Sequence, residues 1–211
     1  REKGTDFVWD ELLAHPPART SMLFRPQTYA PQVDIPPRYA AAFANVPEAL
    51  TKNKPWSVIN TTLGEMELRG DAVFSDSGQL EEILAHLEYG QKINAFLDDR
   101  EAEVRLLDFS DASWANRYLE LLRQENLDQT KDLAASIGMA VEIRFEDFDD
   151  VEADTALKRV QSIPSLSGLS GETEAVWVVR GDLVVVVVAN KFRPGIRTGR
   201  AVNLVFDNFV N

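Results

Sequence analysis

Apolar and polar positions alternate in several short stretches of the chain, a pattern typical of β-strands with one face buried. A tight hairpin is indicated where Gly181 and Asp182 separate two valine-rich stretches, because this residue pair suits a two-residue turn. The hairpin favours antiparallel pairing, since parallel strands need a long crossover connection. The predicted strands cover residues 56–63, 65–74, 103–109, 139–145, 175–180, 183–189 and 201–206.

Other stretches carry apolar residues at helical spacing, as Leu80, Ile83, Leu84 and Leu87 do. Asp111 is a candidate N-cap, and Gly138 is a natural C-terminal stop. The predicted helices cover residues 5–14, 38–44, 79–96, 112–125, 128–137 and 151–160. This order of elements favours an α+β fold, with helices packed on a mainly antiparallel sheet.

Prolines divide the chain into two parts, because eight of the ten fall before residue 56. Proline fixes the backbone φ angle and lacks an amide donor, so long regular elements are not expected there. The same segment carries many apolar side chains, Phe24 and Tyr29 among them, which a flexible linker would not. We therefore predict a Pro-rich, extended apolar arm or strap over residues 1–55 and a single α+β domain over residues 56–211.

The predicted body is strongly acidic. The chain has 211 residues and a net charge of −12; residues 1–55 carry seven Lys/Arg and six Asp/Glu, whereas the rest carries fifteen and twenty-eight. This balance argues against nucleic-acid binding, which needs a positive field. The chain has no cysteine, which excludes disulfides, iron–sulfur clusters and thiol catalysis.

Motifs for catalysis, metals and cofactors are missing from the sequence. Neither phosphate-binding glycine motif occurs, and His15 and His86 do not have zinc-ligand spacing. The acidic run over residues 146–154 is either a calcium site or the solvated start of a helix. We expect no cofactor, no metal and no catalytic residue.

A basic segment interrupts the acidic body over residues 191–200, with four positive charges and no acid. We expect it to join the last two strands as a loop. It either docks on an acidic protein or a lipid headgroup, or folds back onto the chain's own carboxylates. The candidate partner-binding residues are Phe192, Arg193, Arg197 and Arg200 in this segment, with Phe24 and Tyr29 in the arm.

Two segments resemble bacterial extracytoplasmic proteins, especially actinobacterial envelope lipoproteins and sensor-like α+β domains. In those proteins a small Pro/Gly loop, as in Ile163-Pro164-Ser165-Leu166-Ser167-Gly168-Leu169, precedes a hairpin like Val179-Arg180-Gly181-Asp182-Leu183. The stretch Leu107-Asp108-Phe109-Ser110-Asp111-Ala112 looks like their strand-to-helix unit. The resemblance covers about residues 102–189, carries no catalytic residue, and implies a domain of the cell envelope that binds or assists.

These observations lead to a hypothesis with two alternatives. We expect a non-enzymatic accessory or binding domain on the extracytoplasmic side of a bacterial envelope, which docks on a protein, such as a membrane protein complex, on a ligand, or on an anionic lipid surface. The chain begins at Arg1, so an anchor or signal upstream and a cleaved tag both stay open. The alternatives are a hydrolase that uses Asp/Glu chemistry and a cytosolic regulatory α+β domain.

Overall fold

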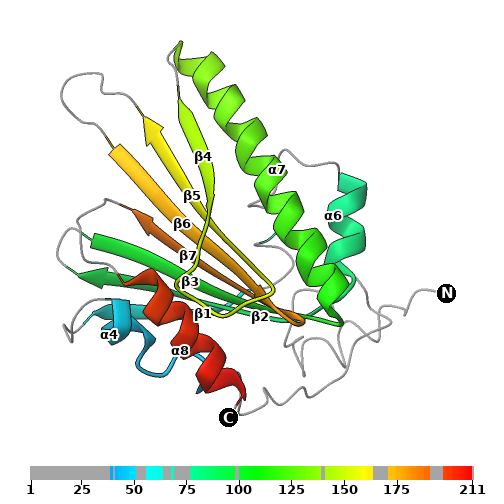
Figure 1. Ribbon diagram of the computed structural model, residues 1–211, viewed down its shortest axis with the longest axis vertical. Coiled ribbons are helices and arrows are strands. Elements are labelled where there is room, and N and C mark those ends of the chain that lie inside the picture. Colours follow the sequence, from blue (N-terminus) through cyan, green and yellow to red (C-terminus); the bar gives the residue numbers. More distant parts are fainter. Residues whose placement is uncertain are drawn as a thin grey trace, which may run out of the picture.

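A seven-stranded antiparallel sheet organises the described part of the chain (Figure 1). The computed structural model describes residues 39, 41–50, 56–63, 68, 77–97, 100–138, 141–163, 171–190 and 197–210. The strands are β1 (Ser57–Thr62), β2 (Leu87–Leu97), β3 (Arg100–Phe109), β4 (Glu142–Asp147), β5 (Thr155–Ile163), β6 (Gly171–Arg180) and β7 (Leu183–Asn190). Their order in the sheet is β1-β2-β3-β7-β6-β5-β4, and every neighbouring pair is antiparallel.

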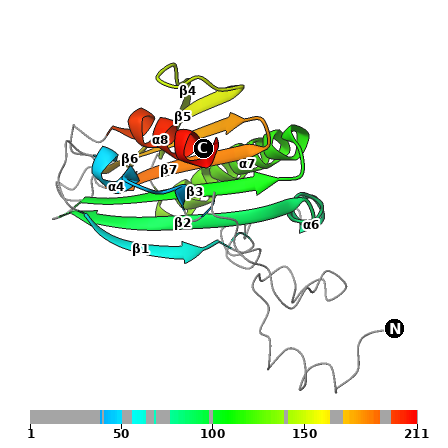
Figure 2. The ribbon, with the colours of Figure 1, turned by 90° about the horizontal axis from the view of Figure 1, so that it is seen from below.

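Helices cover both faces of this sheet. They are α4 (Val46–Leu50), α6 (Ser77–Leu84), α7 (Ala112–Ile137) and α8 (Thr198–Val210). Figure 2 shows α4 and α8 together on one side, where they contact each other, and α6 and α7 belong to the core on the other side. The predicted α+β fold with helices on a mainly antiparallel sheet is confirmed.

The central strand β7 is apolar from Leu183 to Ala189 because both of its faces are buried. In β7, Val185 and Val187 pack in the core with α4 and α8, whereas Val184 and Val186 pack with α6 and α7. Val178 pairs with Val185, so the two side chains share a face. A single helical layer against all of these valines would bury only half of them, and the fold therefore needs three layers.

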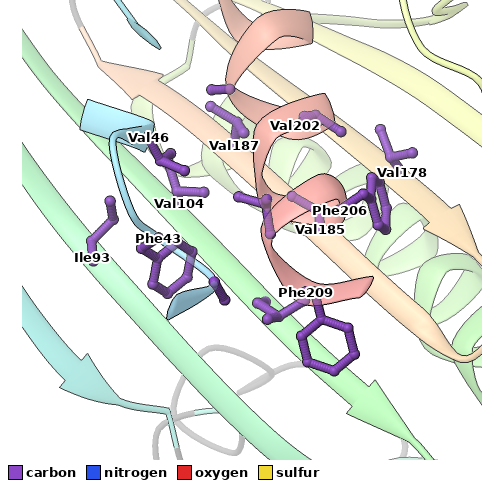
Figure 3. Close-up of a cluster of buried hydrophobic side chains, with 14 of the residues drawn as sticks. Phe43, Val46, Ile93, Val104, Val178, Val185, Val187, Val202, Phe206 and Phe209 are labelled. Carbon is purple, nitrogen blue, oxygen red and sulfur yellow. The ribbon is translucent and has the colours of Figure 1, made fainter. Parts of the chain in front are cut away.

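The core under α4 and α8 includes residues from the predicted arm (Figure 3). Phe43 and Val46 belong to the same buried cluster as Phe206 and Phe209 of α8. Tyr39 stacks on Tyr89 of β2 at 3.7 Å between ring centroids. Residues 39 and 41–50 thus pack against the sheet. The rest of the predicted arm lies outside the described residues, and the division of the chain at residue 55 stays a prediction.

A buried hydrogen bond holds this segment to the sheet. The Tyr39 hydroxyl donates to Asp108 Oδ2 of β3 at 2.5 Å, and both residues are 3% exposed. Because a buried carboxylate needs hydrogen-bond donors, this contact ties the segment before α4 to a central strand. Asn208 of α8 adds a second link, since its side-chain amide donates to the carbonyls of Ala42 and Ala44.

The predicted caps and the predicted hairpin are confirmed. Asp111 Oδ1 accepts hydrogen bonds from the backbone amides of Ser113 and Trp114 and so caps the N-terminus of α7. Gly138 ends the helix with φ 64°, a left-handed conformation that glycine adopts at little cost. Gly181 takes φ 60° in the β6–β7 turn. The two helices predicted over 112–125 and 128–137 form the single helix α7.

The predicted helix over 79–96 is wrong beyond Leu84, because residues 87–97 form β2. Its apolar positions fit either periodicity, and pairing with β1 and β3 selects the strand. Gly90 makes that pairing possible, since a Cβ there would lie 2.3 Å from the Leu63 carbonyl oxygen. Of the predicted strand over 65–74, only Leu68 is described, and it is helical.

Two further predictions are wrong. The predicted helix over 151–160 is mostly strand β5, which pairs with β4 and β6 on its two sides. The predicted strand over 201–206 belongs to α8, whose buried residues Val202, Val205, Phe206 and Phe209 recur at helical spacing. The basic segment consequently leads from β7 into a helix and does not join two strands.

Candidate functional site

A polar cavity lies between the second half of α7 and the sheet. Its volume is about 200 Å³, and its walls come from α7 and from β3, β5, β6 and β7. The apolar wall residues are Leu122, Ala175, Trp177, Val186 and Val188, and the polar ones are Arg105, Glu125, Asn126, Gln129 and Arg159. The cavity thus has an apolar side and a charged side.

The cavity forms where the contact between helix and sheet changes from apolar to polar. Tyr118 and Leu121 face the sheet in the first half of α7, and one turn further on the same face carries Glu125 and then Gln129. The sheet changes in the same way. Arg105 lies two residues before Leu107 on the same face of β3 and brings a charged side chain to the cavity.

Arg159 of β5 reaches into this wall with its guanidinium largely buried. Its Nη1 donates to Asn126 Oδ1 of α7, and its Nη2 donates to Thr173 Oγ1 of β6 at 3.3 Å. Its buried Nε has no hydrogen-bond partner among the described residues. Burial lowers the pKa of Arg159 from its ordinary value. Both acceptors are neutral, and no described carboxylate forms an ion pair with this arginine.

Other charged residues lie at or near the cavity. Arg105 forms an ion pair with Glu103 on the same strand, and Lys92 Nζ lies 3.9 Å from Glu103 Oε2. Glu125 lines the cavity from the helix side and is 4% exposed. Glu103 is shared by two cations, Lys92 and Arg105, whereas Arg159 has only neutral hydrogen-bond partners among the described residues.

The chemical groups that the cavity offers are few. Hydrolysis by paired carboxylates needs two acids facing one substrate. Among the described residues that line the cavity, Glu125 is the one acid, and no hydroxyl, thiol or imidazole accompanies it. The cavity walls can hold a small molecule, and the nucleophiles or paired acids of common hydrolases are missing from them.

A second polar group lies at the start of α7. His86 Nδ1 is 3.1 Å from Ser110 Oγ, and the imidazole stacks on Trp114 at 3.9 Å between ring centroids. The Arg117 guanidinium lies over the Trp114 ring, 4.5 Å from its centroid. Asp111 accepts from Ser113 and Trp114, and these bonds lower the pKa of Asp111. The contacts hold the corner between α6 and α7 together.

The predicted partner-binding residues lie away from the cavity or outside the described residues. The backbone amide of Arg197 donates to the Leu50 carbonyl at 2.8 Å, and its side chain is exposed just before α8. Arg200 is exposed in the first turn of α8. Phe24, Tyr29, Phe192 and Arg193 lie outside the described residues, so the docking surface stays a prediction.

The acidic run over 146–154 forms the end of β4 and the turn into β5. Asp154 Oδ2 accepts from the backbone amide of Gly181 at 2.7 Å, which fixes this turn against the β6–β7 hairpin. In the described ranges, no three His, Cys, Asp or Glu side chains converge as a metal site would require. None of the described helices combines the length and apolar character needed to cross a bilayer.

The cavity residues were not predicted from the sequence, and of the charged ones, Arg105, Glu125 and Arg159, only Glu125 left a signal. Arg105 alternates with the apolar Val104 and Leu106 as an exposed charge would, whereas Glu125 continues the spacing of the buried helix face. A charged residue at an apolar position of a periodic pattern indicates a buried polar site. The three charged residues are far apart in sequence, so only the strand order brings them together.

Comparisons with known proteins find similarity in structure alone. No protein-family model matches the chain, and no curated protein matches it. The extracellular domain of PknH from Mycobacterium tuberculosis is 12% identical, with a TM-score of 0.47 over 85% of this chain and 96% of that one. An uncharacterised protein from Mycobacterium smegmatis is 11% identical, with a TM-score of 0.40 over 81% of this chain and 94% of that one. Both are actinobacterial chains.

Proposed function

We propose that this protein is a non-enzymatic binding domain that takes up a small molecule in the cavity between α7 and the sheet. The observation that carries the proposal is the buried Arg159, whose guanidinium faces the cavity with neutral partners only. A buried charge without a counter-ion destabilises the fold. Such a cost is typical of functional sites, where a ligand supplies the missing partner.

The mixed walls support the same function. Small-molecule sites are concave, largely apolar, and carry a few polar groups that orient the ligand. Here Trp177, Val186 and Val188 form the apolar wall, while Arg105 and Arg159 supply the polar groups. Because these residues lie on regular strands, the site is rigid before the ligand binds.

The extracytoplasmic location belongs to the proposal and rests on the sequence resemblance to envelope lipoproteins and sensor-like domains. Docking on a protein partner through the arm and the basic segment is its second part. Arg197 and Arg200 are exposed at the start of α8, which leaves both side chains accessible to a partner. Neither lines the cavity, so ligand binding and docking use separate surfaces.

A thermal-shift screen of the purified chain tests the binding function. The panel contains sugars, amines, amides and small organic acids, and at least one class is expected to raise the melting temperature, because a ligand that binds only the folded state stabilises it. The Val188→Trp variant fills the cavity and should lose this rise. Val160 lies next to Arg159 but faces the other side of β5, so Val160→Trp is the matched control and should keep it.

Two results would refute the proposal. One is that no class of compound stabilises the chain, and the other is that the stabilising compound acts equally on Val188→Trp. Mass spectrometry of the bound compound after prolonged incubation tests the non-enzymatic part. Recovery of the unchanged compound is expected, and its conversion to a product would favour the hydrolase alternative.

A further inference from the structure

The charges and shape of the cavity also define its ligand. We infer that the ligand is a small organic monocarboxylate, whose carboxylate is bound by Arg159 and whose apolar body lies against Trp177. This inference rests on the proposed binding function and adds the chemical class of the molecule bound. It follows from three features of the cavity, which are its charge balance, the free donors of the guanidinium and its volume.

The charges at the cavity favour a single negative group. Arg105 is paired with Glu103, whereas Arg159 is bonded to an amide oxygen and a hydroxyl. A single anionic group beside Arg159 would give this guanidinium a charged partner. Glu125 also lines the cavity as a buried acid and would repel a second anionic group. A dicarboxylate or a doubly charged phosphate is therefore disfavoured.

The guanidinium has donors left for a carboxylate. Arginine carries five N–H groups, and the two bonds to Asn126 and Thr173 use one on each terminal nitrogen. One N–H on each of the two terminal nitrogens is therefore left, and these two can donate side by side. Two parallel N–H groups match the two oxygens of a carboxylate, which is the strongest common pairing of arginine.

The volume sets the size of the apolar body. A cavity of about 150 Å³ holds one benzene molecule. The cavity here measures about 200 Å³, which leaves room for a six-membered ring and one carboxylate. Trp177 and Leu122 provide an aromatic face and an aliphatic side chain for that ring to pack against. Benzoate has this size and charge, and benzamide is its neutral equivalent of the same shape.

Isothermal titration calorimetry of the full chain with benzoate and with benzamide tests the inference. Benzoate is expected to bind at least about tenfold more tightly, because only its charged group gains from a bidentate bond to arginine. The preference should disappear in Arg159→Met, which keeps much of the side-chain length and loses the charge. Arg144→Met is the matched control, since Arg144 is exposed on the adjacent strand β4, and it should keep the full preference.

Arg159→Lys is a second variant that tests the inference if Arg159→Met fails to fold. It keeps the positive charge and loses the second parallel donor, so it should retain part of the preference for benzoate. Circular dichroism confirms that each variant is folded before titration. Equal binding of benzoate and benzamide, or a preference that survives in folded Arg159→Met, would overturn the carboxylate assignment. In those cases the binding function stands, whereas failure of every compound in the thermal-shift panel would refute the binding function itself.

Discussion

Replacing Tyr39 by Phe tests whether the segment before α4 is part of the folded body. The substitution removes one oxygen, the donor of the 2.5 Å bond to Asp108, and leaves the stacking on Tyr89 in place. A hydrogen bond to a carboxylate contributes about 1.5–3 kcal/mol to stability. Both residues are 3% exposed, so water cannot replace the hydroxyl without opening the core. We expect the free energy of unfolding to fall by about 2 kcal/mol.

Urea denaturation followed by circular dichroism measures this loss. Tyr89→Phe is the matched control, because it removes the same atom from the same aromatic stack and breaks a longer, 3.3 Å bond to the neutral Gln91. It should cost about 1 kcal/mol or less. If Tyr39→Phe costs no more than this control, the segment is only loosely attached to the sheet and the reasoning fails.

Three further substitutions test other parts of the fold. Gly90→Ala should lower the free energy of unfolding by about 1–3 kcal/mol, since its Cβ meets the Leu63 carbonyl oxygen; an unchanged urea midpoint would contradict the β1–β2 pairing. Asp111→Ala should lower the melting temperature at pH 7. The folded pKa of Asp111 is depressed, so its contribution is present above the unfolded pKa and is lost as pH falls through the folded pKa. The difference in melting temperature between Asp111→Ala and the natural chain should therefore shrink in acid. A difference that does not change with pH would show that the negative charge of Asp111 does not stabilise the helix. Arg197→Ala with Arg200→Ala should change stability by less than about 0.5 kcal/mol, and it should weaken binding to anionic lipid vesicles at low salt; unchanged vesicle binding would remove these residues from the docking surface.

Local signals in the sequence predicted the turns and caps correctly. Gly181, Asp111 and Gly138 each act through their own backbone or through residues within three or four positions. Their chemistry is therefore readable without knowing the rest of the fold. The fold class followed from the same source, because a tight hairpin imposes an antiparallel pair.

Elements that depend on distant partners were predicted poorly. Residues 87–97 and 201–206 are short apolar stretches whose spacing suits a helix or a strand. The first became β2 because β1 and β3 pair with it, and the second became part of α8 because Phe206 and Val202 cover a sheet that is already complete there. Tertiary packing decided both, and intrinsic propensity was too weak to compete.

The cavity could not be predicted for a related reason. Arg105 belongs to β3, Glu125 to α7 and Arg159 to β5. In the sheet β7 and β6 lie between β3 and β5, and all of these elements line one cavity, which the sequence order does not reveal. Each residue by itself resembles an ordinary surface charge. Their place in one cavity becomes visible once the strand order is known, and the neutral partners of Arg159 become visible once its contacts are known.

The most direct test of a ligand cavity beneath α7 is the NMR resonance of the Arg159 Nε–H group during a titration with benzoate. This group belongs to the guanidinium of a residue that lines the cavity, and it has no hydrogen-bond partner among the described residues. If the carboxylate binds this guanidinium, the Nε proton resonance should shift and saturate together with the calorimetric binding curve, because charge-assisted hydrogen bonds form at the terminal nitrogens of the same group. An Arg159 resonance that stays unchanged while benzoate binds would contradict the account.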